Sequence, residues 1–347
     1  MVVTTPRDSP RRASTMKQVA ALAGVGTKTV SRVVNGEPRV APETAERVWD
    51  AVRALDYHVD MRAGSLRRAD GRTRTVGLLV SSVNNPFAGE IHRGVEDVAR
   101  ARGVAVLTAS LHEEPEREVR AVEDFISRRL DGIILASTST DMSYLSTAVT
   151  QGMQMVFIDR RPLGVSVDSV TSDNRQAAAR ATGQLIGRGH RRIAFLGERS
   201  SIRTAAERHL GFMDAYGEAG IPTGEAVVVF GLGSAAEAQR ALGELLDRRE
   251  PPTAVFASQN LITIGALHAL HARGLQHAIA LIGFDDLELA DLLVPGVTVI
   301  RQESQQLGRV AAERMFRQLD DGPLPPEQII VPTAYIERGS GEIRAPG

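Results

Sequence analysis

The feature that most constrains this chain is an alternation, from residue 76 onward, of short apolar runs with longer amphipathic stretches. Runs such as 76–80 and 132–136 are apolar throughout, which is typical of strands buried on both faces of a parallel sheet. The stretch 115–130 between two runs has the residue spacing of a helix. The alternation restarts near Thr171. The sequence therefore predicts an α/β body of two lobes of similar size.

The expected strands are short and fall into two groups. They are 76–80, 104–108, 132–136 and 155–158 in the first lobe, and 192–196, 227–230, 254–256 and 279–283 in the second. A last helix over 303–319 and a strand over 328–331 end the pattern.

The segment before the body has the pattern of three short helices. Thr15 and Gln18 have the spacing of a capping box, and Gly24 suits the left-handed position after a first helix. Helical spacing resumes over 27–34, and Pro42 suits the first position of a third helix. Two short helices separated by a glycine-containing turn, followed by a third, predict a helix-turn-helix.

Charge is divided unevenly between these two parts. Residues 1–75 contain 14 lysines and arginines against 8 aspartates and glutamates, a net charge of +6, whereas the remainder has a net charge of −7. Both lysines of the chain, Lys17 and Lys28, lie in the first part. A basic head on an acidic body favours a nucleic-acid-binding head. The alternative, a basic solvated tail, does not account for the helical pattern.

Several classes of protein are disfavoured. The chain has no cysteine, which excludes disulfides and thiolate metal sites. Its apolar runs are far shorter than a membrane span, and the N-terminus lacks an apolar leader. We therefore expect a cytoplasmic protein with no membrane association. We expect no cofactor and no metal, because His268, His271 and His277 have no accompanying carboxylate or thiolate.

Two groups of acidic residues are not expected to form functional sites. The acidic run is expected to be a solvated helix start; it consists of Glu113, Glu114, Glu116 and Glu118. Asp285 and Asp286 are not expected to form a catalytic pair, because neighbours at a strand end point to opposite sides. An α/β enzyme and a transporter's solute-binding protein remain alternatives. The first lacks a catalytic constellation, and the helix-turn-helix and missing leader oppose the second.

The residues also match a known family. The segment AGVGTKTVSRVVNG in the head is specific, and the body contains SSVNNPF at 81–87, VFIDRRP at 156–162, GHRRIAFLG at 189–197 and LIGFDD at 281–286. From Thr15 to Val331 the chain resembles the lactose/galactose-repressor (LacI/GalR) family of transcription regulators. The resemblance implies a DNA-binding repressor with a two-lobed body like a periplasmic sugar-binding protein, parallel sheets and three crossovers. It also implies a homodimer on a nearly palindromic operator and a small polar effector between the lobes.

The resemblance gives the following division of the chain. A disordered polar tail covers 1–14, a helix-turn-helix domain 15–60 and a hinge helix or linker 61–75; the first lobe covers 76–170 and 302–330, and the second lobe 171–301 and 331–347.

The second helix of a helix-turn-helix enters the major groove with its first residues at the base edges. By resemblance, the base readers are Thr27, Lys28 and Arg32, with Thr29 and Ser31 serving phosphates or packing. The other DNA-binding candidates are Thr15, Asn35 and Leu66. Leu66 resembles the family's minor-groove wedge; alternatively it is a tether residue packed on the body. Gly26 stands where the family usually has serine, which removes one phosphate contact.

The effector site is expected outside the C-terminal ends of the body's strands. Amides, carboxylates and one aromatic ring suit a polyhydroxylated ligand. The candidates are Ser82, Asn84, Phe87, Asp159, Arg160, Arg203, Gln259, Asn260, Asp285 and Gln302. Phe87, Asp159, Asp285 and Gln302 are carried over by resemblance. By a count back from Gly211, the family's effector-binding arginine is Ala206 here. Arg203 either replaces it or is a surface residue.

Overall fold

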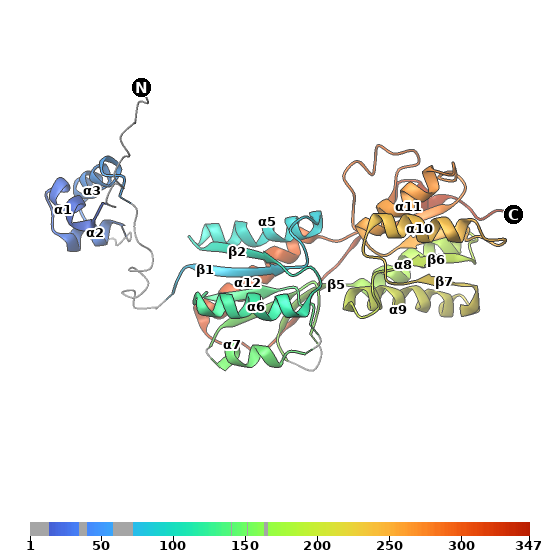
Figure 1. Cartoon of the computed structure of the whole chain (residues 1–347), viewed down its shortest axis with the longest axis horizontal. Coiled ribbons are helices and arrows are strands. Elements are labelled where there is room, and N and C mark those ends of the chain that lie inside the picture. Colours follow the sequence, from blue (N-terminus) through green and yellow to red (C-terminus); the bar gives the residue numbers. More distant parts are fainter. Residues whose placement is uncertain (1–13, 35–39, 58–71, 140, 151, 163–165) are drawn as a thin grey trace, which may run out of the picture. The chain divides into compact units, whose positions relative to one another are not determined.

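The computed structural model describes residues 14–34, 40–57, 72–139, 141–150, 152–162 and 166–347. The chain divides into a small unit, Met1–Thr73, and a large unit, Arg74–Gly347 (Figure 1). The tail up to residue 13, Asn35, Leu66 and most of the expected hinge lie outside the described residues.

The small unit contains the expected three helices, α1 (Met16–Ala23), α2 (Thr27–Val34) and α3 (Pro42–Ala54). Both bonds of the predicted capping box are present, because Thr15 accepts from Gln18 N and the Gln18 side chain accepts from Thr15 N. Gly24 adopts the left-handed conformation, with φ 65°. The prediction of a helix-turn-helix is thus confirmed. Its first residue differs from expectation, since Ser14, assigned to the tail, donates to Leu55 O at 2.6 Å.

The first lobe of the large unit is built on a parallel sheet in the order β11-β5-β4-β3-β1-β2. Its strands are β1 (Thr75–Val80), β2 (Ala105–Ser110), β3 (Gly132–Leu135), β4 (Gln154–Ile158), β5 (Asp168–Ser172) and β11 (Gln328–Val331). Helices α5 (Pro86–Ala101) and α12 (Ser304–Asp321) share one hydrophobic core with the sheet. Helices α6 (Pro115–Ser127) and α7 (Ser146–Thr150) share another, which the short 3-10 helix η1 (Ser143–Leu145) joins.

The second lobe repeats this architecture. Its sheet has the order β12-β10-β9-β8-β6-β7 and is parallel except for β12. The strands are β6 (Ile193–Leu196), β7 (Val227–Val229), β8 (Ala254–Ala257), β9 (Ala280–Phe284), β10 (Thr298–Arg301) and β12 (Ala334–Ile336). Helices α8 (Asn174–Gly187) and α9 (Arg203–Glu218) share one core with the sheet, and α10 (Ala235–Leu246) and α11 (Asn260–His271) share the other. Two 3-10 helices, η2 (Thr223–Glu225) and η3 (Ser340–Glu342), complete the lobe.

The chain crosses between the lobes three times, as predicted. It leaves the first sheet after β5, returns after β10 to form α12, and leaves again between β11 and β12. The strand predicted over 328–331 is β11, but the expected lobe boundaries at residues 76, 170 and 330 each cut a strand of the first sheet, because β1 begins at Thr75, β5 extends to Ser172 and β11 to Val331. Strand β5 itself is absent from the apolar pattern, because only Val170 among its five residues is apolar.

A buried ionic network joins α12 to the first sheet. Asp168, at the start of β5, accepts from Arg314 Nε at 2.9 Å, from the Gln318 amide and from Glu327 N at 2.7 Å. The Arg314 and Asp168 side chains are 7% and 2% exposed. Arg314 also pairs through Nη1 with Glu327 at 3.2 Å, but the Glu327 side chain is 55% exposed. Removing Asp168 therefore leaves the buried guanidinium without its buried partner, which destabilises strongly.

We therefore expect Asp168→Ala to lower the free energy of unfolding of the large unit by about 3 kcal/mol. Circular dichroism during urea unfolding reports the large unit, whereas fluorescence of Trp49, the single tryptophan, reports the helix-turn-helix and should keep its midpoint. The control is Asp214→Ala, which breaks the exposed pair with Arg175 and should cost less than about 1 kcal/mol. Equal losses for the two variants would contradict the assignment.

Candidate functional site

The first turn of α2 presents its side chains outward. Thr27 and Lys28 are exposed, whereas Thr29, Ser31 and Arg32 are half-buried. The opposite side of the helix packs into the core of the small unit through Val30 and Val33. The two residues expected to meet base edges first are therefore free to do so, and Thr15 is exposed at the start of α1.

In the large unit, two aspartates occupy equivalent places in the two lobes. Asp159 follows β4 and Asp285 follows β9, and both adopt a left-handed backbone with φ 66°. Each backbone N–H still bonds the next strand, Asp159 N to Val170 O at 2.9 Å and Asp285 N to Ile300 O at 2.8 Å. A left-handed non-glycine residue is strained, and such strain concentrates at functional sites. Both residues are buried, at 9% and 7% exposed.

A buried arginine that is not among the predicted site residues acts electrostatically on both carboxylates. Arg208 on α9 is 3% exposed. Its Nε donates to Asn174 Oδ1 at 2.8 Å, its Nη1 donates to Ser258 O at 2.7 Å, and its guanidinium lies 3.6 Å from the centre of the Phe284 ring. Among the described residues it makes no ion pair. A charged donor is thus buried between neutral partners, with N–H groups left to bind further acceptors, although Arg208 lines neither of the two cavities described below.

The buried charges shift one another's titration. Burial raises the pKa of Asp159, and the charges of Arg160 and Arg208 oppose this. Burial raises the pKa of Asp285, against Arg208 and the Gln302 hydrogen bond. Burial likewise raises the pKa of Glu198 to about 7, although Arg160 and Arg208 lower it. Among these three carboxyl groups, Glu198 is the one whose pKa is raised to about 7.

Four predicted effector residues line one cavity of about 290 Å³. They are Phe87, Asn260, Asp285 and Gln302. The Gln302 amide donates to Asp285 Oδ1 at 2.7 Å, while Gln302 Oε1 is buried without a partner. Asn260 donates to Asn85 Oδ1 at 2.8 Å, a contact between the two lobes. Asp286 lines the same cavity and binds Arg338 at 2.6 and 2.7 Å, whereas Asp285 binds Gln302.

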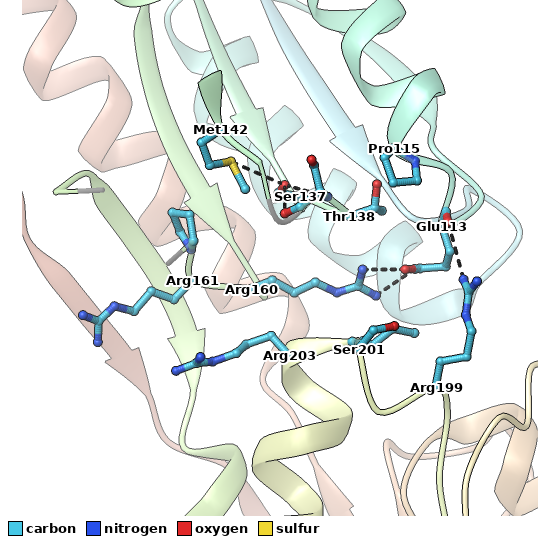
Figure 2. A pocket seen from close by; sticks show the side chains of 13 residues that line it. Glu113, Pro115, Ser137, Thr138, Met142, Arg160, Arg161, Arg199, Ser201 and Arg203 are labelled. Carbon is cyan, nitrogen blue, oxygen red and sulfur yellow. Dashed lines mark hydrogen bonds and ion pairs between the residues drawn. The ribbon is translucent and has the colours of Figure 1, made fainter. Parts of the chain in front are cut away.

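A second cavity of about 360 Å³ is lined by both arginines predicted for the effector site, Arg160 and Arg203 (Figure 2). Arg160 is 9% exposed and donates through both Nη atoms to the Glu113 carboxylate, at 2.7 Å each. Arg203, at the start of α9, pairs with Glu207 at 2.9 Å. Arg199, which the sequence reasoning did not single out, donates to Glu113 O across the lobes at 3.4 Å.

The remaining candidates have other surroundings. Gln259 caps α11 by accepting from Leu261 N and Ile262 N, and it lines neither cavity. Ser82 and Asn84 bond to each other in the loop before α5 and also line neither cavity. Ala206 is half-buried on α9. Arg208, two residues further along the helix, is buried.

Within the acidic run 113–118, Glu114 and Glu116 are exposed at the start of α6 as expected, but Glu118 contradicts the expected solvated helix start. Glu118 is fully buried and accepts from the Ser137 hydroxyl, from Thr138 and from Ser139 N. The Tyr144 hydroxyl also donates to it. Helical spacing explains the error, because Glu118 faces inward with Val122 and Phe125. In the described part of the chain, no group of three or more potential metal-binding side chains occurs, and no helix could span a membrane.

Comparison with known proteins covers both units. A family model for bacterial regulatory proteins of the lacI family matches residues 15–60. A second, for periplasmic binding proteins and the sugar-binding domain of the LacI family, matches residues 73–339. The chain belongs to the LacI family. It is therefore a helix-turn-helix transcriptional regulator with a body of the sugar-binding type.

Its relatives resemble it over nearly their whole length. The chain is 32% identical to the HTH-type transcriptional regulator GalR of Escherichia coli (strain K12), over 94% of this chain and 95% of GalR. It is also 32% identical to the ribose operon repressor of the same organism, covering 94% and 99%. Among solved structures, a CelR–cellobiose complex is 32% identical, with a TM-score of 0.69 and coverage of 94% and 100%. A lac repressor dimer bound to operator, 23% identical with a TM-score of 0.83, covers 95% and 99% and shares the fold.

The raised pKa of Glu198 has a consequence for stability. A carboxyl with a folded pKa near 7 and an ordinary unfolded pKa near 4.3 stabilises the folded state below pH 4. This contribution is lost as the pH rises through 7. We expect Glu198→Gln to remove up to about 3 kcal/mol of that decline, measured as urea-unfolding free energies at pH 5, 6, 7 and 8. Parallel pH profiles for wild type and variant would contradict it.

Proposed function

We propose that this LacI-family regulator is a cytoplasmic homodimeric repressor, and not an enzyme, whose operator affinity is controlled by a small polar ligand held between its lobes. A sugar or related metabolite suits the hydrogen-bonding side chains of the cavities. The observation that carries the proposal is the cluster around Arg208. A buried guanidinium, two strained aspartates and an interlobe amide contact converge at the strand ends of both lobes.

Buried polar atoms without hydrogen-bond partners support a ligand at this place. Such atoms are rare, and each needs an explanation. In the described residues they include Ser172 Oγ, Ser258 Oγ and Gln302 Oε1. All three belong to residues at or just beyond the C-terminal ends of strands, where open α/β sheets bind ligands.

Ligand binding would control DNA binding through the relation between the lobes. Asn85 and Asn260 belong to different lobes and meet at 2.8 Å, and Arg199 reaches Glu113 O across the same gap. A ligand that contacts both lobes changes these contacts and thereby favours one lobe arrangement. In a dimer, that arrangement sets the spacing of the two operator-reading heads, a coupling of about 1–3 kcal/mol.

An apolar surface of the second lobe supports the homodimer. Leu289, Leu292 and Val294 are 61%, 71% and 72% exposed in one segment. Clustered exposed apolar side chains mark interaction surfaces. Together with the two-fold symmetry of a palindromic operator, this surface favours a second copy of the chain as the partner.

We expect Lys28→Ala to relax the preference for one base pair in an operator selected from random duplexes, by about 1–3 kcal/mol. The lysine is exposed on the first turn of α2 and can donate to guanine. Band-shift titrations against single-base operator variants measure the change. The control, Arg12→Ala in the basic tail, should keep base preference and at most reduce the dependence of affinity on salt. No tight binding to any selected duplex would contradict the regulator itself.

We expect Arg208→Lys to abolish the response of the operator complex to its ligand, while operator affinity without ligand stays within about twofold. Lysine keeps the charge but loses the planar fork that bonds several partners at once. The measurement is operator release or capture during metabolite titration, with circular dichroism confirming the fold. Arg249→Lys, at an exposed arginine outside both cavities, is the control. An unchanged ligand response in Arg208→Lys would exclude Arg208 from the site.

A further inference from the structure

The second cavity has an unusual lining for a site that takes neutral sugars. Four arginines line it, and Glu113 is the one carboxylate among its described lining residues. Both Glu113 oxygens are bound by Arg160, so that pair is neutral as a unit. The remaining lining arginines are Arg161, Arg199 and Arg203. The body beyond residue 75 has a net charge of −7, which makes this cationic lining a local feature.

The positive charges of these three arginines are neutralised by neighbouring carboxylates less completely than that of Arg160. Arg161 is exposed and, within the described part of the chain, makes no ion pair and no hydrogen bond. Arg199 bonds only the Glu113 carbonyl oxygen. Arg203 pairs with Glu207 through Nε alone. In Figure 2, Arg161 and Arg203 extend toward the same side of the cavity from different lobes. Like charges that share a cavity repel unless an anion lies between them.

The start of α9 contributes to the same side of the cavity. Ser201, Ile202 and Arg203 line it, and this 16-residue helix has no side-chain cap at its N-cap residue, Ile202. Its first-turn N–H groups are therefore available, and an uncapped helix N-terminus favours an anion. The arginines and the helix start act in the same direction.

The opposite wall has a different hydrogen-bonding character. The Ser137 and Thr138 hydroxyl protons are donated to the buried carboxylate of Glu118. The hydroxyl oxygens can then only accept from a molecule in the cavity. Acceptors of this kind suit sugar hydroxyls and not an anion. The cavity thus offers acceptors on one wall and cations on the other.

We propose that the ligand of this regulator is an anionic sugar or polyol, with a phosphate or carboxylate group bound by Arg161 and Arg203, whose guanidinium groups lie on the same side of the cavity (Figure 2). Its hydroxyls face Ser137 and Thr138. This inference rests on the proposed function, since it specifies the chemical class of ligand for the same interlobe region. Arg160 is a positioning residue here, because its Nη atoms are occupied by Glu113.

The test uses the full-length chain and isothermal titration calorimetry at constant ionic strength. The probes are inorganic phosphate, glucose, glucose 6-phosphate and glucuronate. We expect inorganic phosphate and at least one charged sugar to bind at least about tenfold more tightly than glucose, because a hydrogen bond to a charged group contributes more than one to a neutral group. Comparing glucose 6-phosphate with glucuronate shows whether the cavity prefers a phosphate or a carboxylate group.

Variants locate the anion. We expect the double variant Arg161→Gln/Arg203→Gln to weaken the charged probes at least about tenfold, while the surface control Arg120→Gln/Arg249→Gln keeps wild-type affinity. Single variants, with a thermal-unfolding check, replace the double variant if it fails to fold. The proposal is overturned if no anionic probe binds saturably, if glucose binds as tightly, or if the variants and control behave alike.

Operator band shifts on the same samples separate this inference from the proposed function. If a neutral sugar alters operator binding and no anion binds, the proposed function stands and the anionic ligand is wrong. If anions bind through these arginines but nothing that binds alters operator affinity, the anion site stands and the ligand-controlled repressor is wrong.

Discussion

The electrostatics of the interlobe region depend on the contacts of one buried guanidinium, that of Arg208. Arg208 cannot lose its proton at any ordinary pH, and isolating a charge from water is costly. The protein surrounds it with an amide oxygen of Asn174, a carbonyl oxygen of Ser258 and the face of Phe284. All three are neutral. The charge therefore acts on Asp159, Asp285 and Glu198, and it remains available to a ligand that brings hydroxyl or anionic oxygens.

This position of Arg208 follows from the packing of two helices. Gly211, one turn further along α9, lies so close to α8 that a Cβ atom there would be 1.9 Å from Arg175 O. The close approach lets Arg208 reach Asn174, the first residue of α8. The first lobe joins α5 and α12 in the same way, since a Cβ on Gly94 would be 2.1 Å from Gln305 O. Small residues at helix contacts thus position the strand ends that line the ligand region.

The sequence predicts the elements that depend on local patterns. Apolar alternation gives most strands, and the cap at Thr15 and the turn at Gly24 give the start of the helix-turn-helix. It fails where burial is decided by distant partners. Strand β5 is polar and is buried because α12 and β11 cover it, and Glu118 is buried because the loop 137–139 donates to it.

For the candidate site, the sequence predicts which residues follow the strands, but not the contacts that they make. Strand-end residues such as Asp159, Asp285 and Gln302 are expected from topology, but their strain and contacts are not. Gln259 has the chemistry of a ligand residue and instead caps a helix. Arg208 was accessible from helical spacing, since it shares a face with the buried Ala205 and Phe212. The count along the resemblance led to Ala206, and a count along the sequence does not show which helix face is buried.

The central claim is that a ligand bound between the lobes changes their arrangement. Because the chain has no cysteine, spin labels can be placed uniquely at Glu123→Cys on α6 and Glu244→Cys on α10, both exposed. Electron–electron double resonance then measures the distance between the lobes with and without a ligand that alters operator binding. The account predicts a shifted and narrowed distance distribution that Arg208→Lys abolishes. An unchanged distribution at saturating ligand would contradict it.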